Sequence, residues 1–373
     1  MNISEASDPQ AWDSFILSQP WKPFLQSWTM GEVYREVGQE PVRLIAKDGS
    51  GIKCICFGHI VPAKRGRHLS VPYGPVLDHR LSENEQGTTF RELVDSLKKI
   101  AESRGCSFIR MSPFWPSPSQ PHPLTPNPVP SPLHLLAEHI WFMKLKTENK
   151  PRTGEEILAG MRKTARNLIR RAEKDGVTVE ASENPVKDLQ VFIDLHSETR
   201  RRHGFTPYSD AFFRSQVSLF APRGECTLYL AKFQGEVIAS SVHMHFGGET
   251  SYHHGASASK FSKIPASYLL QWTAIKDALK RSDDIYNFWG IAPPSPTPNP
   301  SPEGGGALPP LSPLGGKGSG DRGKKHPFSG VTLFKTGFGG ELLNLKHCFD
   351  LPLSRKYWLT YGFELLRKWH RGF

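Results

Sequence analysis

The chain has 373 residues, of which 38% are hydrophobic, and its 47 Lys and Arg outnumber 36 Asp and Glu to give a formal net charge of +11. This length and hydrophobic content exclude a wholly disordered chain and predict about two to three domains. The positive charge indicates an anionic partner such as nucleic acid, a pyrophosphate or lipid headgroups, and excludes no fold.

Membrane and secretion signals are missing from the sequence. Residues 1–19 are acidic and polar, and no stretch has the apolar length that a membrane-spanning helix needs. The five cysteines form no regular disulfide framework, which favours a reducing compartment. We therefore expect a cytoplasmic protein.

Short β-branched or aromatic stretches bounded by turn residues predict strands. In chain order they are 42–46, 52–61, 107–111, 141–145, 226–233, 237–246, 250–255 and 285–289. Helices are predicted at 90–104, 160–175, 189–203, 265–281 and 355–369. The alternation predicts an α/β (α+β) fold of two similar units, each with antiparallel hairpins and flanking helices.

Two proline-rich tracts interrupt this pattern. Residues 116–132 contain eight prolines, and residues 293–313 contain nine, followed by a Gly-rich, basic run to Lys325. Proline removes hydrogen-bond donors and glycine disfavours ordered backbone, so neither tract is expected inside a helix or sheet. We interpret 116–132 and 293–325 as flexible insertions; a proline-rich recognition segment is the alternative.

Two basic segments are candidates for binding anions. Arg162, Arg166 and Arg170 recur every fourth residue and form a row along one face of the helix predicted at 160–175. This row suits the phosphates of a nucleic acid, although a solvated basic face has the same pattern. Arg202 belongs to three consecutive arginines at a helix end, which suit either the helix dipole or a pyrophosphate or carboxylate ligand.

A histidine-rich hairpin raises the question of a metal. His243 and His245 on one predicted strand face Tyr252, His253 and His254 on the next, which would place two or three imidazoles on one sheet face. A zinc site would need a third or fourth ligand with compatible geometry, and we predict no metal and no cofactor.

Lys335 stands beside Phe334 and precedes three glycines within residues 330–341. The pattern indicates a tight turn that presents one cation. Such a cation next to a reacting carbonyl stabilises a developing oxyanion, an effect of about 3 kcal/mol. The alternative is a surface lysine before a hairpin.

Ordered segments resemble the Fem family (FemABX) of peptidoglycan-bridge aminoacyltransferases. They extend over nearly the whole chain outside the two tracts, in the order of the family: 24–33, 73–76, 170–177, 202–205, 252–257, 265–276, 286–291, 330–341 and 350–353. The resemblance implies two acetyltransferase-like (GNAT-related) domains with mixed, largely antiparallel sheets. Residues 1–150 would form the first, completed by 345–373, and residues 151–344 the second, of the type without a coiled-coil arm.

The resemblance also implies an activity: transfer of an amino acid from aminoacyl-tRNA to the stem-peptide amine of UDP-MurNAc-pentapeptide or lipid II. Lys335 occupies the position of the family's catalytic lysine, and Arg202, Tyr252 and Phe334 those of substrate contacts. The arginine row would bind tRNA phosphates. The basic, aromatic residues 355–373 would touch the inner membrane surface or pack as a terminal helix on the first domain.

The sequence departs from the family near Tyr34, where some relatives have a substrate-contacting lysine, and at Asn287, where an aspartate is common. Three alternatives therefore stay open: an acyl-CoA-dependent N-acyltransferase, a basic RNA-binding protein without catalysis, and a transferase that modifies protein N-termini. The segment before residue 265 lacks the glycine that an acyl-CoA pyrophosphate loop would need.

Overall fold

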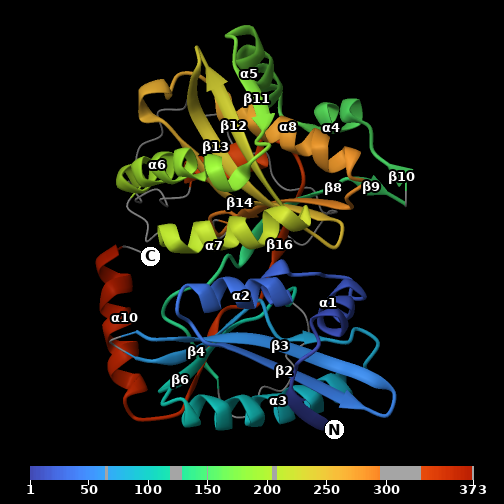
Figure 1. Ribbon diagram of the computed structural model, residues 1–373, viewed down its shortest axis with the longest axis vertical. Helices are drawn as coiled ribbons and strands as arrows, with labels where there is room; N and C mark the ends of the chain where they lie inside the picture. The colour runs from blue at the N-terminus through green and yellow to red at the C-terminus, as the bar shows by residue number, and fades with distance from the viewer. Residues whose placement is uncertain (64–65, 118–127, 149, 204–207, 295–328, 372–373) are drawn as a thin grey trace, which may run out of the picture.

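The computed structural model shows two β-sheets with helices between and around them (Figure 1). It describes residues 1–63, 66–117, 128–148, 150–203, 208–294 and 329–371, and at 202–203 and 370–371 the backbone alone. Among these residues the strands form an eight-stranded sheet, a seven-stranded sheet and a two-stranded ribbon. None of the helices in these ranges has the length and hydropathy that crossing a bilayer requires.

The first sheet combines strands from both ends of the chain. In spatial order these are β1 (Asn2–Glu5), β2 (Pro41–Asp48), β3 (Gly51–Val61), β4 (His68–Pro72), β6 (Phe108–Ser112), β17 (Phe349–Pro352) and β7 (Val129–Pro130), with β5 (Val76–Leu77) on β3. Neighbours are antiparallel except β4 and β6, which are parallel. The connection between β4 and β6 contains α3 (Glu83–Ser103).

The second sheet repeats this plan. Its order is β11 (Thr178–Ala181), β12 (Cys226–Phe233), β13 (Glu236–Phe246), β14 (Glu249–Ser257), β15 (Ile285–Gly290), β8 (His139–Lys144) and β16 (Glu341–Asn344). Its parallel pair, β14 and β15, is joined through α8 (Ala266–Lys280). The predicted two-unit α/β fold with mixed, largely antiparallel sheets is confirmed. The ribbon consists of β9 (Lys146–Thr147) and β10 (Lys150–Pro151).

Side-chain caps determine where several helices begin. Ser82 and Glu85 form a capping box at the start of α3, and Ser27 and Ser209 cap the helices that follow them. The remaining helices are α1 (Pro9–Leu17), α2 (Trp28–Glu36), α4 (Gly154–Gly160), α5 (Lys163–Lys174), α6 (Pro185–His203), α7 (Asp210–Phe220), α9 (Ser329–Thr336) and α10 (Tyr357–Arg371).

The largest hydrophobic core joins the two units. It contains Trp12 and Phe57 from the N-terminal part of the chain and Phe213, Phe220 and Val242 from the second unit, all buried. Figure 1 shows α2 and α7 facing each other between the sheets. Two further cores lie under α3 and under α5 and α8. Burial of shared apolar surface therefore favours one fixed arrangement of the sheets.

Between its described strands, the chain passes from one sheet to the other twice. The first crossing lies between β7, in the first sheet, and β8, which pairs with β15 and β16 in the second. The predicted boundary at residue 150 assigned β8 to the first unit and is wrong, because the ladder partners of β8 come from residues after 284. The second crossing lies between Asn344 of β16 and Phe349 of β17.

The first proline-rich tract is partly built into the fold. Val129 and Pro130 form the edge strand β7 against β17, and the Ser117 N–H donates to the Asn344 carbonyl (2.7 Å). The prediction that 116–132 is entirely a flexible insertion is wrong at these ends, since proline fits the free side of an edge strand. Residues 118–127, and 295–328 of the second tract, lie outside the described residues.

Buried charges hold the C-terminal segment on the first sheet. Arg110 of β6 makes a bidentate pair with Asp350 of β17 (2.8 Å for both contacts) and a second pair with Glu364 of α10. The Tyr357 hydroxyl also donates to Asp350 (3.1 Å). One guanidinium therefore fixes β17 and α10 together.

Candidate active site where the parallel strands separate

The parallel pairing of β14 and β15 is short. It joins Glu249–Ser251 to Ile285–Asn287 and then stops, while β14 continues to Ser257. On β15 the ladder with β8 is irregular between Asn287 and Gly290, and Trp289 has a positive φ of 67°. The strands therefore separate here and leave backbone groups of β15 for other partners.

Lys335 fills this position from the last turn of α9. Its Nζ donates to the Gly290 carbonyl (2.7 Å) and lies 5.6 Å from the centroid of the Tyr252 ring. Its exposed fraction is 7%, so the interpretation as a surface lysine is wrong. Burial lowers the pKa of Lys335 from 10.5 to about 7, because the charged form loses hydration.

Tyr252 is placed by a glycine three residues further along its own strand. An ideal Cβ at Gly255 would lie 1.8 Å from the Tyr252 hydroxyl oxygen, so only glycine leaves room for this ring. The ring stacks on His243 at 5.4 Å, and burial raises the pKa of Tyr252 to about 12. The predicted pair Lys335 and Tyr252 is thus brought together in one site.

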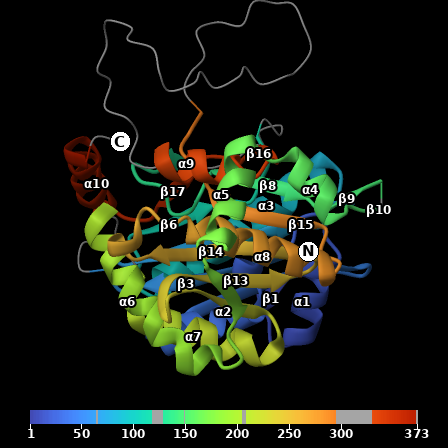
Figure 2. The ribbon, with the colours of Figure 1, turned by 90° about the horizontal axis from the view of Figure 1, so that it is seen from above.

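The glycines after Lys335 make a tight approach to other backbone. Gly339 and Gly340 have φ values of 81° and 112°, which favour glycine. An ideal Cβ on Gly339 would lie 2.8 Å from the Gly160 carbonyl oxygen. The Arg162 N–H donates to the Gly337 carbonyl (2.9 Å), and Figure 2 shows α9 next to α5. The turn therefore joins the lysine site to the start of the basic helix.

The basic row on α5 is shorter than predicted. The predicted helix 160–175 is interrupted, because α4 ends at Gly160 and α5 begins at Lys163, with Arg162 as its exposed N-cap. The Arg166 Nη1 donates to the carbonyls of Leu158, Ala159 and Met161 (3.3, 3.2 and 2.6 Å). Arg166 therefore caps α4, whereas Arg162 and Arg170 remain exposed.

The other predicted substrate contacts have different outcomes. Phe334 is half-buried and packs edge-on against Tyr268 (4.9 Å) and Phe338 (5.4 Å), one residue before Lys335. Arg202 is in the last turn of α6, and its side chain lies outside the described residues. Its role stays a prediction.

The four histidines of the hairpin do not all share one sheet face. His243 contacts Tyr252 and the Tyr286 hydroxyl (2.9 Å), whereas the rings of His253 and His254 lie 3.9 Å apart in the core between the sheets. His243 and His245 are two residues apart and share a face of β13, but His253 and His254 do not face them as expected, because a register shift after Val242 changes the pairing of the strands.

Sequence reasoning missed two features of the site. The Gly290 carbonyl that accepts from Lys335 follows from the irregular ladder of β15 and has no sequence signal. The second is on the next residue in sequence: the Thr336 hydroxyl is buried and has no hydrogen-bond partner in the described part of the chain. Gly255, by contrast, had a sequence signal, because a glycine inside a predicted strand indicates that another group approaches the backbone closely.

Comparisons with known proteins identify the fold. Residues 159–294 match the model of the acetyltransferase (GNAT) domain family. The crystal structure of FemX is similar over 98% of this chain and 100% of that one, with a TM-score of 0.73 and 17% identity. The predicted resemblance to the Fem family is therefore confirmed in the fold.

Two further structures are similar at lower scores. One is a C-terminal domain assigned to a lysylphosphatidylglycerol synthetase from Agrobacterium fabrum, with a TM-score of 0.53, 12% identity and 98% coverage of each chain. The other is L-PGS from Bacillus licheniformis, with a TM-score of 0.50, 12% identity and coverage of 100% of this chain and 99% of that one.

Proposed function

We propose that this protein is a Fem-type aminoacyltransferase that moves an amino acid from aminoacyl-tRNA to the stem-peptide amine of a peptidoglycan precursor in the cytoplasm. The observation that carries the proposal is the buried amino group of Lys335, held by the Gly290 carbonyl where the strands separate. The FemX-like fold over the whole chain supports the choice of reaction.

The proposed chemistry is an aminolysis. The acceptor amine attacks the ester carbonyl of aminoacyl-tRNA, a C–N bond forms, and the C–O bond to the ribose breaks. The amine loses a proton, and the tRNA leaves with its hydroxyl group. Lys335 in its ammonium form stabilises the oxyanion of the tetrahedral intermediate in a site with little water. The Tyr252 ring, 5.6 Å from Nζ, gives this cation a further favourable contact.

A tRNA donor gives the exposed arginines a ligand. The Arg162 backbone is bonded to the turn that follows Lys335, so a phosphate on Arg162 would lie close to the reacting ester. Arg170 lies two helical turns further along α5. One bound aminoacyl-tRNA could therefore place its aminoacyl ester at Lys335 and its phosphates along α5.

The acceptor is a nucleotide-linked or lipid-linked precursor, and α10 favours the lipid-linked form. Trp358, Leu359, Leu366 and Trp369 on α10 are 55%, 78%, 66% and 81% exposed. Helical spacing places them on one side, opposite Tyr357, which packs on the first sheet. An apolar stripe with exposed Arg355 and Lys356 beside it suits an anionic membrane surface.

An acyl-CoA-dependent N-acyltransferase is the second candidate, supported by the match of residues 159–294 to the GNAT domain family. It is less well supported, because α8 starts after Pro265 without a preceding glycine that would let a pyrophosphate approach.

The test offers a pool of charged tRNAs with labelled amino acids to UDP-MurNAc-pentapeptide and, separately, to lipid II, with and without RNase. We expect labelling that RNase abolishes and that Lys335→Met lowers by about a hundredfold or more. Lys276→Met, which removes an exposed lysine of α8, is the matched control. Labelling of neither acceptor, together with acylation from acyl-CoA, would replace the proposal by the second candidate.

A further inference from the structure

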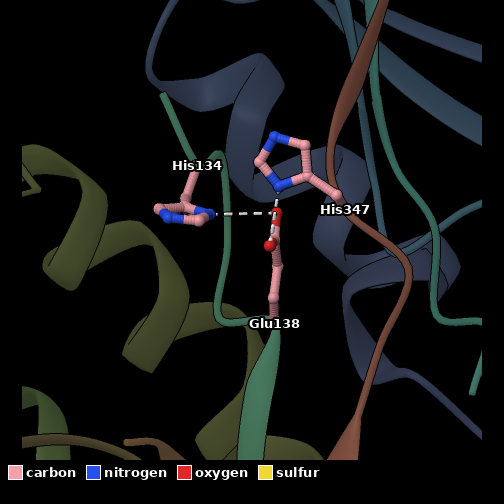
Figure 3. Close-up of side chains that lie close together, drawn as sticks. All are labelled: His134, Glu138 and His347. Atoms are coloured by element: carbon pink, nitrogen blue, oxygen red, sulfur yellow. Dashed lines mark hydrogen bonds and ion pairs between the residues drawn. The ribbon is translucent and has the colours of Figure 1, made fainter. Parts of the chain in front are cut away.

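Three ligating side chains meet where the chain crosses between the sheets (Figure 3). His134 and Glu138 precede β8 in the first crossing, and His347 lies in the second. The Nδ1 atoms of His134 and His347 lie 3.0 and 2.9 Å from the two oxygens of Glu138. All three ligating atoms lie within 4.8 Å of one another. This crossing cluster is separate from the residues of the Lys335 site.

The hydrogen bonds around the cluster fix which ring atom is available. The Nε2 of His347 lies 3.1 Å from the Ser131 carbonyl, which only accepts, so Nε2 carries the hydrogen. In the neutral ring, Nδ1 then has a lone pair, and this lone pair faces a carboxylate oxygen. Two lone pairs that face each other repel, and either a proton on Nδ1, which the Glu138 hydrogen bond favours by raising the pKa of His347, or a metal ion between the two atoms removes the repulsion. A carbonyl that holds the remote N–H is the usual support of a metal-bound histidine.

We propose that His134, Glu138 and His347 bind a divalent first-row transition ion, with Zn²⁺ as the best match to two imidazoles and one carboxylate. At metal–ligand distances of about 2.0–2.2 Å, neighbouring ligands of a tetrahedral ion lie about 3.4 Å apart. The separations in the cluster, from 2.9 Å to at most 4.8 Å, bracket this value. Small rotations of the two rings are sufficient to form the site.

The remainder of the site is suited to entry and retention of the ion. His134 and His347 are 59% and 42% exposed, which leaves a path and a fourth position for water. Glu138 is only 7% exposed, and its Oε1 also accepts from the Cys348 N–H (2.8 Å), so the carboxylate is held in place.

A metal here would connect the two crossings directly. Glu138 and His347 lie on chain segments that are separated by the whole second unit, and the Leu345 N–H donates to the Glu138 carbonyl (2.7 Å). Bound Zn²⁺ would add a further link to the hydrogen bonds at this point and stabilise the folded state by mass action.

The experiment titrates tag-free, EDTA-treated full-length protein with ZnCl₂ against a chromophoric chelator and records the melting temperature at each zinc concentration. We expect one ion per chain, and a melting temperature that rises with zinc. His134→Ala and His347→Ala should each weaken binding by more than tenfold. Glu138→Gln, which keeps the shape of the side chain, should do the same. Co²⁺ in place of Zn²⁺ should give the absorption of a low-coordinate nitrogen–oxygen site that both histidine variants lack.

His79→Ala is the control. His79 is 47% exposed and lies beside Asp78, but among the described residues it does not belong to a group of three that could hold a metal ion. Equal zinc affinity in the wild type and in the His134→Ala/His347→Ala double variant would overturn the proposal. A wild-type melting temperature that does not change with zinc would also overturn the proposal. The three side chains would then form only hydrogen bonds and ion pairs with one another. Circular dichroism of each zinc-free variant separates loss of the site from loss of the fold.

Discussion

The charge of Lys335 depends on the fold. In the folded protein its amino group contacts the Gly290 carbonyl and the face of the Tyr252 ring in place of water. Because the folded state lowers its pKa from 10.5 to about 7, the unfolded chain holds a proton between these values that the folded chain has lost. Stability from this group therefore rises with pH across that window, and below about pH 7 the destabilisation is complete.

Replacing Lys335 should reveal this effect. Lys335→Met removes the buried charge, so its gain in free energy of unfolding should be larger at pH 6 than at pH 9, by about 2 kcal/mol. Urea denaturation of both proteins at the two pH values measures the difference. A gain that is equal at both values would mean that Lys335 is hydrated in the folded protein.

The same residue should shape the pH profile of transfer. The ammonium form is lost above about pH 7, whereas the attacking amine becomes more reactive as pH rises. We expect a bell-shaped kcat/KM in the wild type. Lys335→Arg keeps its charge, so its profile should lack the falling limb. A falling limb that persists in Lys335→Arg would assign it to another group.

Gly255 gives a test of the position of Tyr252. The Cβ of Gly255→Ala would occupy the place of the Tyr252 hydroxyl, so the ring must move and transfer should fall on the order of tenfold. Gly49→Ala, where a Cβ meets nothing within 4 Å, is the control. In a Tyr252→Ala background the loss from Gly255→Ala should disappear. Additive losses would show that Gly255 acts independently of Tyr252.

Helix α5 has two kinds of arginine, and they should respond differently to substitution. Arg162→Ala and Arg170→Ala should each reduce the salt dependence of tRNA binding by roughly one phosphate contact. Arg166→Ala should lower the melting temperature instead, because α4 loses the cap on its last carbonyls. Binding measured from 50 to 300 mM salt separates the classes, and an equal change of slope in all three variants would contradict this assignment.

Helix α10 should bind membranes through its exposed side. We expect the protein to sediment with vesicles that contain anionic phospholipid, less so at high salt, and Leu359→Ser/Leu366→Ser to abolish this binding. Leu17→Ser, which alters an apolar side chain of α1 that is 45% exposed, is the control. Unchanged sedimentation of the double variant would place membrane contact elsewhere or nowhere.

Elements with strong local signals were predictable, and elements stabilised by distant partners were not. The hairpin strands and α8 lie close to their predicted bounds. Helix α3 begins seven residues before the predicted 90, although Ser82 and Glu85 formed a capping signal in the sequence. Strands β16 and β17 have four residues each, and their partners lie more than a hundred residues away. Their pairing is a tertiary effect that no local pattern contains.

The candidate site shows the same division. The resemblance selected Lys335 and Tyr252, which the fold brings together. It did not distinguish Arg166, which caps α4, from Arg162 and Arg170, because this cap exists only where the chain breaks between α4 and α5. The crossing cluster escaped sequence reasoning, since His347 is distant in sequence from His134 and Glu138.

At the scale of the molecule, two described residues that flank the second insertion, Ala292 and Thr332, lie side by side. The Ala292 N–H donates to the Thr332 hydroxyl (2.8 Å), so a short connection is able to replace what lies between them. We expect deletion of 293–325 to leave the melting temperature within a few degrees and transfer intact or faster. A folded deletion variant without activity would show that the tract contributes to function.

The position of β17 in the first sheet has a consequence for synthesis on the ribosome. This strand lies between β6 and β7, yet residues 349–352 are made after the entire second unit. Until they emerge from the exit tunnel, the edge of β6 has no partner and Arg110 has no Asp350. Such an unpaired edge favours wrong pairing. The first sheet therefore stays incomplete until the second unit has been made. Nascent chains stalled before residue 349 should depend on a chaperone more than chains stalled beyond the end of α10.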